Sequence, residues 1–277
     1  ILKIQESMVR KIVTELRDYD NLYYEVCNEP YFGDTLALRQ WEEHMTMVVA
    51  DAEKDFGQKH LISNNIQNDF KLVPAPRPGV SIYNFHYASP PRTVGANYHL
   101  NKVIGDNETG FDGIEDLPYR REAWEFILAG GALYNNLDYS FTADSEDGSF
   151  PVRKPQPGGG GKSLRLQLKT LAGFMNSLDY INMKPMGSEM FRIVSGGKET
   201  FDGLWKEGTY ALYINTNDTG TKTTEFEINI PAGSYEITWT DTRSGEKRSE
   251  MKDHAGGWFK AVTERYSEDI ALLLIRK

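Results

Sequence analysis

Apolar and polar residues alternate over the first two thirds of the chain as short apolar runs and amphipathic stretches. Amphipathic spacing predicts helices at 2–18 and 35–56, the second ended by Gly57. Strands that alternate with helices are typical of a parallel α/β fold. We expect strands at 22–27, 60–65, 81–86, 102–106 and 132–137, and later helices at 119–128 and 163–180.

The pattern changes near residue 190. From there the chain has short alternating segments separated by polar turns, and no stretch of helical length intervenes. This pattern predicts a small antiparallel β-sandwich with strands at 210–214, 226–230, 235–240 and 270–275. We therefore expect two domains, an α/β domain at 1–185 and a sandwich at 186–277.

Two of the predicted strands end in a carboxylate. The segment 24–30 reads Tyr-Glu-Val-Cys-Asn-Glu-Pro and places Glu29 at a strand end, and Glu108 follows the strand at 102–106. In a β/α barrel, residues at the carboxyl ends of strands face the active site. Two carboxylates in such positions suit glycoside hydrolysis, in which one transfers a proton and the other attacks the anomeric carbon. The alternative is that Glu29 is a solvated turn residue and Glu108 a loop carboxylate.

The segment 24–30 resembles the fourth-strand motif of the clan A glycoside hydrolases, especially the family 5 cellulase-like enzymes. The resemblance implies that Glu29 is the acid/base, that Asn28 is its substrate-binding neighbour and that Glu108 is the nucleophile at the end of the seventh strand. His86 and Tyr87 follow the expected sixth strand and are similar to the clan's His-x-Tyr region, although here the two residues are adjacent. They are candidates for binding substrate and for positioning the nucleophile.

On this numbering the chain carries strands four to eight of a (β/α)8 TIM barrel. The first three strands are then expected from sequence outside this chain or from another chain, because an open barrel exposes strand edges and its apolar interior.

The predicted eighth strand adds three polar candidates for sugar binding, Asn135, Asn136 and Asp138. Their alternative role is to close the barrel and satisfy backbone groups. Residues 123–141 resemble a group of glycosidases from Bacteroidetes and Planctomycetes, and residues 239–245 resemble the small sandwich, sometimes labelled as collagen-binding, that follows such barrels. We interpret the sandwich as a structural cap.

Composition narrows the function classes. The net charge of −9 argues against a nucleic-acid partner, and no apolar run is long enough to span a membrane. The five histidines lack the spacing of metal ligands, and the glycines at 158–161 lack the strand that precedes a phosphate-binding loop. We expect no metal and no cofactor.

The sequence thus predicts a retaining glycoside hydrolase that cleaves β-linked oligo- or polysaccharides, secreted or periplasmic in a bacterium. The alternative is a catalytically inert carbohydrate-binding or adhesion module.

Overall fold

The structure is a computed structural model that describes all residues except 32–34, 155–157 and 195–196. The chain divides into two compact units, and each is described by itself. The first unit holds 1–109 and 131–134, and the second holds 110–130 and 135–277.

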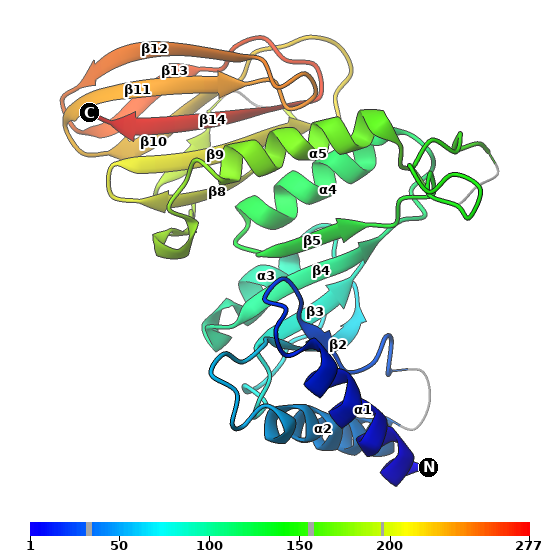
Figure 1. The fold of residues 1–277 in the computed structure, drawn as a ribbon. Coiled ribbons are helices and arrows are strands. Elements are labelled where there is room, and N and C mark those ends of the chain that lie inside the picture. Colours follow the sequence, from blue (N-terminus) through cyan, green and yellow to red (C-terminus); the bar gives the residue numbers. More distant parts are fainter. Residues whose placement is uncertain (32–34, 155–157, 195–196) are drawn as a thin grey trace. The chain divides into compact units, whose positions relative to one another are not determined.

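Helices are concentrated in the first two thirds of the chain (Figure 1). Among the described residues, none of them combines the length and the apolar composition needed to cross a membrane. The helices are α1 (Leu2–Leu16), α2 (Thr35–Ala52), α3 (Arg92–Asn97), α4 (Asp116–Leu128) and α5 (Lys162–Met175), with 3-10 turns at Tyr98–Leu100 and Tyr180–Asn182.

A sheet with the order β1-β2-β3-β4-β5 is built on the first unit. The pairs β1–β2, β2–β3 and β3–β4 are parallel, so the carboxyl ends of these strands meet at one edge. Register shifts interrupt the ladder near the ends of β2 and β3. The strands are β1 (Tyr24–Glu25), β2 (Ile62–Asn68), β3 (Ile82–His86), β4 (Val103–Thr109) and β5 (Leu133–Asn136).

Apolar packing fixes the helices of the first unit to this sheet. Helices α1 and α2 lie side by side (Figure 1), and their Val13 and Val49 join Ile62 of β2 in one buried cluster. Every residue of β3 is buried, as expected for a strand covered on both faces.

The second unit contains two antiparallel sheets. One has the order β13-β10-β7 and the other the order β12-β11-β14-β9-β8-β6. The strands are β6 (Lys184–Pro185), β7 (Phe191–Ile193), β8 (Glu199–Lys206), β9 (Thr209–Thr216), β10 (Glu225–Ile230), β11 (Gly233–Thr240), β12 (Lys247–His254), β13 (Gly257–Val262) and β14 (Asp269–Arg276).

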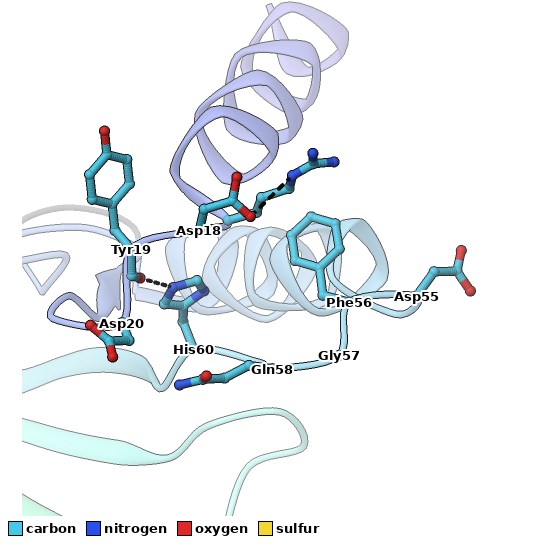
Figure 2. A pocket seen from close by; sticks show the side chains of 9 residues that line it. Asp18, Tyr19, Asp20, Asp55, Phe56, Gly57, Gln58 and His60 are labelled. Atoms are coloured by element: carbon cyan, nitrogen blue, oxygen red, sulfur yellow. Dashed lines mark hydrogen bonds and ion pairs between the residues drawn. The ribbon is translucent and has the colours of Figure 1, made fainter.

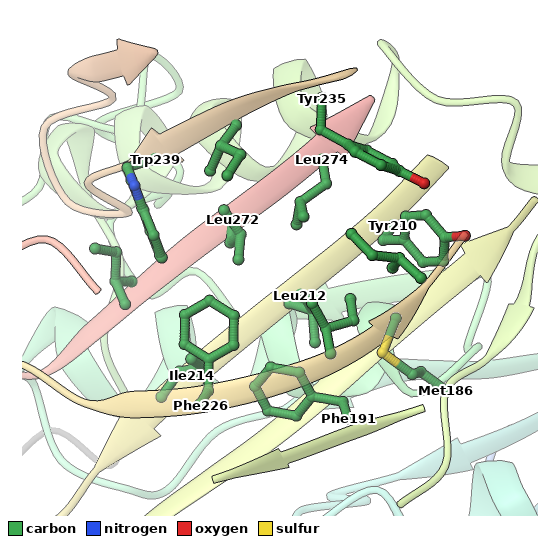
Figure 3. Close-up of a cluster of buried hydrophobic side chains, with 14 of the residues drawn as sticks. Met186, Phe191, Tyr210, Leu212, Ile214, Phe226, Tyr235, Trp239, Leu272 and Leu274 are labelled. Carbon is green, nitrogen blue, oxygen red and sulfur yellow. The ribbon is translucent and has the colours of Figure 1, made fainter. Parts of the chain in front are cut away.

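One buried cluster joins these two sheets (Figure 3). Every second residue of a strand points to the same face, so period-two alternation supplies the cluster from each strand. The members on the central strands are Tyr210, Leu212 and Ile214 of β9, Phe226, Ile228 and Ile230 of β10, Tyr235, Ile237 and Trp239 of β11, and Ile270, Leu272 and Leu274 of β14.

Helix α4 packs on β9 and on α5 within the same unit. The ring of Trp124 stacks on Tyr213 with centroids 5.5 Å apart and meets Phe174 edge-on. Beside them the buried Arg120 guanidinium binds both carboxylate oxygens of Asp269 at 3.0 and 2.9 Å. A fully desolvated arginine needs such partners, so this pair fixes α4 to β14.

The prediction of an α/β region with a parallel sheet, followed by antiparallel sheets, is confirmed. The five strand segments and the long helices occur close to their expected positions, although β1 spans only two residues. The predicted strands of the second region correspond to β9, β10, β11 and β14, whereas β6, β7, β8, β12 and β13 were not predicted. The residues of β12 are polar and largely exposed on both faces, so no alternation marks that strand.

Candidate functional site

The two predicted catalytic glutamates lie close together at the carboxyl edge of the parallel sheet. Glu29 follows β1, and Glu108 lies near the end of β4. Each has about a quarter of its side chain exposed, whereas His86 at the end of β3 is fully buried. Its Nδ1 atom lies 3.4 Å from Glu29 Oε1 and 3.7 Å from Glu108 Oε2. One carboxylate oxygen of each glutamate and one ring nitrogen lie within 4.8 Å of one another.

Glu29 adopts a left-handed backbone conformation, with φ of 48°. Such conformations are uncommon for residues other than glycine and need support from their surroundings. Asn65 of β2 gives this support, because its Oδ1 accepts a hydrogen bond from the Glu29 amide at 2.9 Å. The Tyr31 hydroxyl lies 3.1 Å from Glu29 Oε1 and also within hydrogen-bond distance of Asn68, so its single proton can serve either acceptor.

Tyr87 holds Glu108 from the neighbouring strand. It is also left-handed, with φ of 53°, and its hydroxyl donates to Glu108 Oε1 at 2.5 Å. Its amide donates to the Glu108 carbonyl at 2.9 Å. The main chain and the side chain of Tyr87 therefore position Glu108 together, which is consistent with the role predicted for this residue.

Asp106 is a residue of the site that sequence reasoning did not assign. It lies two residues before Glu108 and is 1% exposed. Its Oδ2 accepts from the Ala88 amide at 3.0 Å, so Asp106 fixes the turn that carries Tyr87. Burial raises the pKa of Asp106 to about 8, against the opposing effect of hydrogen bonds from backbone amides.

Glu25, on β1, accepts hydrogen bonds from uncharged groups. Its Oε2 accepts from Ser63 at 2.8 Å and from Asn84 at 2.9 Å, with Asn107 at 3.4 Å. Glu25 is half-buried, and a carboxylate removed from water needs compensating partners. A hydroxyl and side-chain amides serve as these partners, so Glu25 is part of a hydrogen-bonded support for the strand ends.

Two groups depart from this pattern among the described residues, Asp106, whose buried Oδ1 has no hydrogen-bond partner, and the imidazole ring of His86. Within the described part of the chain, neither ring nitrogen makes a hydrogen bond of acceptable geometry. A buried polar group without a partner is costly and calls for an explanation. Both glutamates lie within ion-pair distance, so the ring is placed to interact with a carboxylate or with a ligand between them. The same three groups are spaced closely enough to ligate a metal ion.

The remaining predicted residues are Asn28, Asn135, Asn136 and Asp138. Asn28 is exposed. Asn135 and Asn136 end β5, and Asp138 follows them, all in the second unit. Asp138 accepts hydrogen bonds from Ser140 and Arg165, and these outweigh its burial and lower its pKa. Its contacts favour the alternative that it organises its own loop, while the sugar-binding roles of these residues stay predictions.

A larger cavity lies at the opposite, amino-terminal end of β1 and β2 (Figure 2). It measures about 450 Å³ and is lined by 17–20 after α1 and by residues between α2 and β2, including His60. Both His60 nitrogens are satisfied, Nδ1 by Glu53 at 2.5 Å and Nε2 by the Tyr19 carbonyl at 2.6 Å. His60 therefore connects two loops and is not available for chemistry.

Comparisons with known proteins concern the fold. No family model matches the chain, and the curated proteins give no significant match. A solved structure described as a glycoside hydrolase has a TM-score of 0.70 at 14% identity, over 100% of this chain and 69% of that chain. A family 5 glycoside hydrolase from Bacteroides vulgatus has a TM-score of 0.70 at 13% identity, over 99% of this chain and 67% of that chain.

A family 30 endoxylanase from Clostridium papyrosolvens has a TM-score of 0.59 at 11% identity, over 100% of this chain and 71% of that chain. Likeness at such low identity shows a shared arrangement of the chain and leaves the chemistry to be argued from the site. The chain has the fold found in these glycoside hydrolases.

Proposed function

We propose that the chain acts as a retaining glycoside hydrolase on β-linked glycans. Glu29 is the acid/base and Glu108 is the nucleophile. The neighbours in fold support this class of enzyme, since several families of glycoside hydrolase share the arrangement. The β-linkage and the assignment of the two roles come from the resemblance of the strand-end motifs to clan A.

One observation carries the proposal, the separation of the two carboxylates. Oxygens of Glu29 and Glu108 lie within 4.8 Å of each other. Retaining enzymes have carboxyl groups about 5–5.5 Å apart, whereas inverting enzymes need about 6.5–9.5 Å to admit a water molecule. The short separation therefore supports direct attack by one carboxylate on the sugar.

The reaction proceeds by double displacement. A Glu108 oxygen forms a bond to the anomeric carbon as the bond to the leaving oxygen breaks, and that oxygen takes the proton of Glu29. Water then attacks the anomeric carbon and gives its proton to Glu29, which releases the sugar and restores both carboxyl groups. The substrate has to bind so that its glycosidic oxygen lies beside Glu29 and its anomeric carbon beside Glu108.

Neighbouring side chains assist each step. The hydrogen bond from Tyr87 directs one oxygen of Glu108, which leaves the other to attack. Tyr31 contacts Glu29 in the same way, and burial together with that hydrogen bond raises the pKa of its phenol, which keeps it a proton donor. His86 Nδ1 lies between the two carboxylates, 3.4 Å from an oxygen of Glu29 and 3.7 Å from an oxygen of Glu108, so the ring contacts both reacting groups.

The proposal extends to the architecture. We infer that β1–β5 correspond to strands four to eight of a (β/α)8 barrel, and that the antiparallel sheets form a sandwich with a sequence boundary at 185/186. Export to the periplasm or the medium of a bacterium belongs to the same proposal.

The test is hydrolysis of a panel of aryl β-glycosides by the wild type and by E29Q and E108Q. We expect each variant to lose about 10³-fold or more in kcat, and the wild type to release the β-anomer first, as followed by NMR. Unchanged turnover in both variants would exclude the two-carboxylate mechanism, and release of the α-anomer would exclude retention.

A divalent-metal site is a second use of the same residues, favoured by the unsatisfied nitrogens of buried His86. Dialysis against a chelator distinguishes the two-carboxylate mechanism from a metal-dependent one. Loss of hydrolysis on chelation, restored by one divalent metal, would replace the proposal with metal-assisted hydrolysis. An inert binding module would instead bind glycans and turn over none of the panel.

A further inference from the structure

A second cavity of the first unit adjoins the candidate site. It measures about 280 Å³ and lies among the loop after β1, the start of α2 and the loop between β2 and β3. Two of its lining residues, Tyr31 and Asn65, are the residues that hydrogen-bond Glu29. The cavity is therefore one side chain away from the candidate acid/base.

The charge of this lining differs from that of the chain. The whole chain carries a net charge of −9, but the lining contains three cations and one carboxylate, namely Arg39, Lys71, Arg77 and Glu42. Arg39 lies 3.5 Å from Glu43, and Arg77 lies 3.6 Å from Glu42. Lys71 has no ion pair among the residues that the structure describes. A positive cavity in an acidic protein selects negatively charged ligands.

Glu42 gives the second, independent sign of a ligand. It is 5% exposed, and its Oε1 has no hydrogen-bond partner within the described chain. Burial raises the pKa of this carboxyl, although Arg77 opposes the shift. A buried carboxyl oxygen without a partner is stabilised when a ligand supplies a hydrogen-bond donor.

The two features together define the ligand. An inorganic anion satisfies the cations but offers Glu42 little, because an ionised phosphate or sulfate has few or no protons to donate. A neutral sugar satisfies Glu42 but not the cations. A sugar with an anionic group offers both hydroxyl donors and a negative charge, and the apolar side chains of Ile66 and Val73 complete the lining.

We propose that this cavity is a subsite for a sugar residue that carries an anionic group, a carboxylate or a sulfate, next to the residue whose linkage is cleaved. Lys71 and Arg39 bind the anionic group, and Glu42 Oε1 accepts a hydrogen bond from a sugar hydroxyl. The inference rests on the proposed function and adds a substrate class to it, an acidic glycan.

The experiment measures binding and needs no turnover. Dissociation constants of glucuronate, glucose 6-sulfate, glucose and inorganic phosphate are determined by NMR titration at low ionic strength, for the wild type and for E108Q. We expect an acidic sugar to bind about tenfold more tightly than glucose or phosphate in both proteins. Whether glucuronate or glucose 6-sulfate binds more tightly identifies the anionic group.

The matched variants are K71Q and K59Q. Lys59 is also an exposed lysine of the first unit, but it precedes β2 whereas Lys71 follows it. K71Q should weaken binding of the acidic sugar about tenfold and leave glucose unchanged, and K59Q should change neither. E42Q should weaken the acidic sugar and leave phosphate unchanged.

Three results would each overturn the proposed subsite. They are equal affinity for glucose and the acidic sugars, equal effects of K71Q and K59Q on binding, and no binding of any sugar at millimolar concentration. Phosphate binding as tight as that of the acidic sugars would reduce it to a simple anion site. These results are independent of the proposed function, which fails if E29Q and E108Q retain full hydrolytic activity even though Lys71-dependent binding persists.

Discussion

His60 and His86 lie at opposite ends of the same parallel sheet, and both have side chains that are almost fully buried. His60, at the amino end, has both nitrogens within 2.6 Å of an acceptor. One of these acceptors, the Tyr19 carbonyl, is seen in Figure 2. His86, at the carboxyl end, lies between two carboxylates without a hydrogen bond of good geometry. The contacts of His60 thus stabilise the amino end of the sheet. At the carboxyl end, the buried His86 ring without hydrogen bonds is energetically costly, as is common at functional sites.

The largest expected effect belongs to the carboxyl end. E29Q and E108Q should each reduce kcat about 10³-fold or more, because Gln neither donates the required proton nor attacks the anomeric carbon. Their melting temperatures should stay close to that of the wild type, since both side chains are partly exposed. Thermal melts followed by circular dichroism are the control for folding. If the variants also lost their fold, the loss of kcat would not assign a catalytic role to the carboxyl end of the sheet.

The pair H60Q and H86Q tests the comparison itself. H60Q should lower the free energy of unfolding by about 3 kcal/mol, because it leaves the buried Glu53 carboxylate without its cationic partner. At 25 °C its kcat should be unchanged. H86Q should lower kcat about 10²-fold with a smaller effect on stability. Denaturant unfolding and steady-state kinetics measure both, and an exchange of the two phenotypes would contradict the assignment.

Tyr87 should give a smaller effect on catalysis. Y87F removes a hydrogen bond of 2.5 Å to Glu108 and leaves the ring in place. Loss of one charge-assisted hydrogen bond predicts a decrease of about tenfold in kcat with little change in KM. Y98F, a change at an exposed tyrosine of the same unit, is the matched control. An increase in KM with unchanged kcat would show that Tyr87 binds substrate and does not position Glu108.

The smallest effect is a dependence of stability on pH at the amino end. Burial lowers the pKa of His60, but hydrogen bonds to Glu53 and to the Tyr19 carbonyl outweigh it and leave the pKa raised above 6.5. A raised pKa in the folded state means that His60 stabilises the fold fully below pH 6.5 and loses this contribution as pH rises through the folded pKa. The stability difference between wild type and H60Q should therefore shrink from pH 6 to pH 9, and a difference that grows would reverse the sign.

The sequence predicts where the strands end, but it does not predict which residues the side chains at those ends contact. An apolar run followed by Asn-Glu-Pro marks Glu29, and an apolar run followed by a carboxylate marks Glu108. The sequence does not show that Tyr31 reaches Glu29. Its contact with Glu29 depends on the left-handed turn at Glu29 and on Asn65, which lies on another strand.

The two histidines show the same limit of prediction from the sequence. His60 and His86 each lie beside a predicted strand, so the local pattern does not separate them. Their difference arises from the parallel register, which places Glu108 opposite His86, and from the end of α2, which carries Glu53 to His60. Both depend on contacts between residues far apart in the chain, which hydrophobic periodicity does not encode.

Rescue of an E108A variant by azide tests the central claim most directly. Removing the nucleophile leaves space for a small anion, so azide at molar concentration should restore turnover of an activated aryl β-glycoside and yield an α-glycosyl azide identified by NMR. Full activity of E108A without azide, or a β-glycosyl azide as the product, would contradict attack by Glu108.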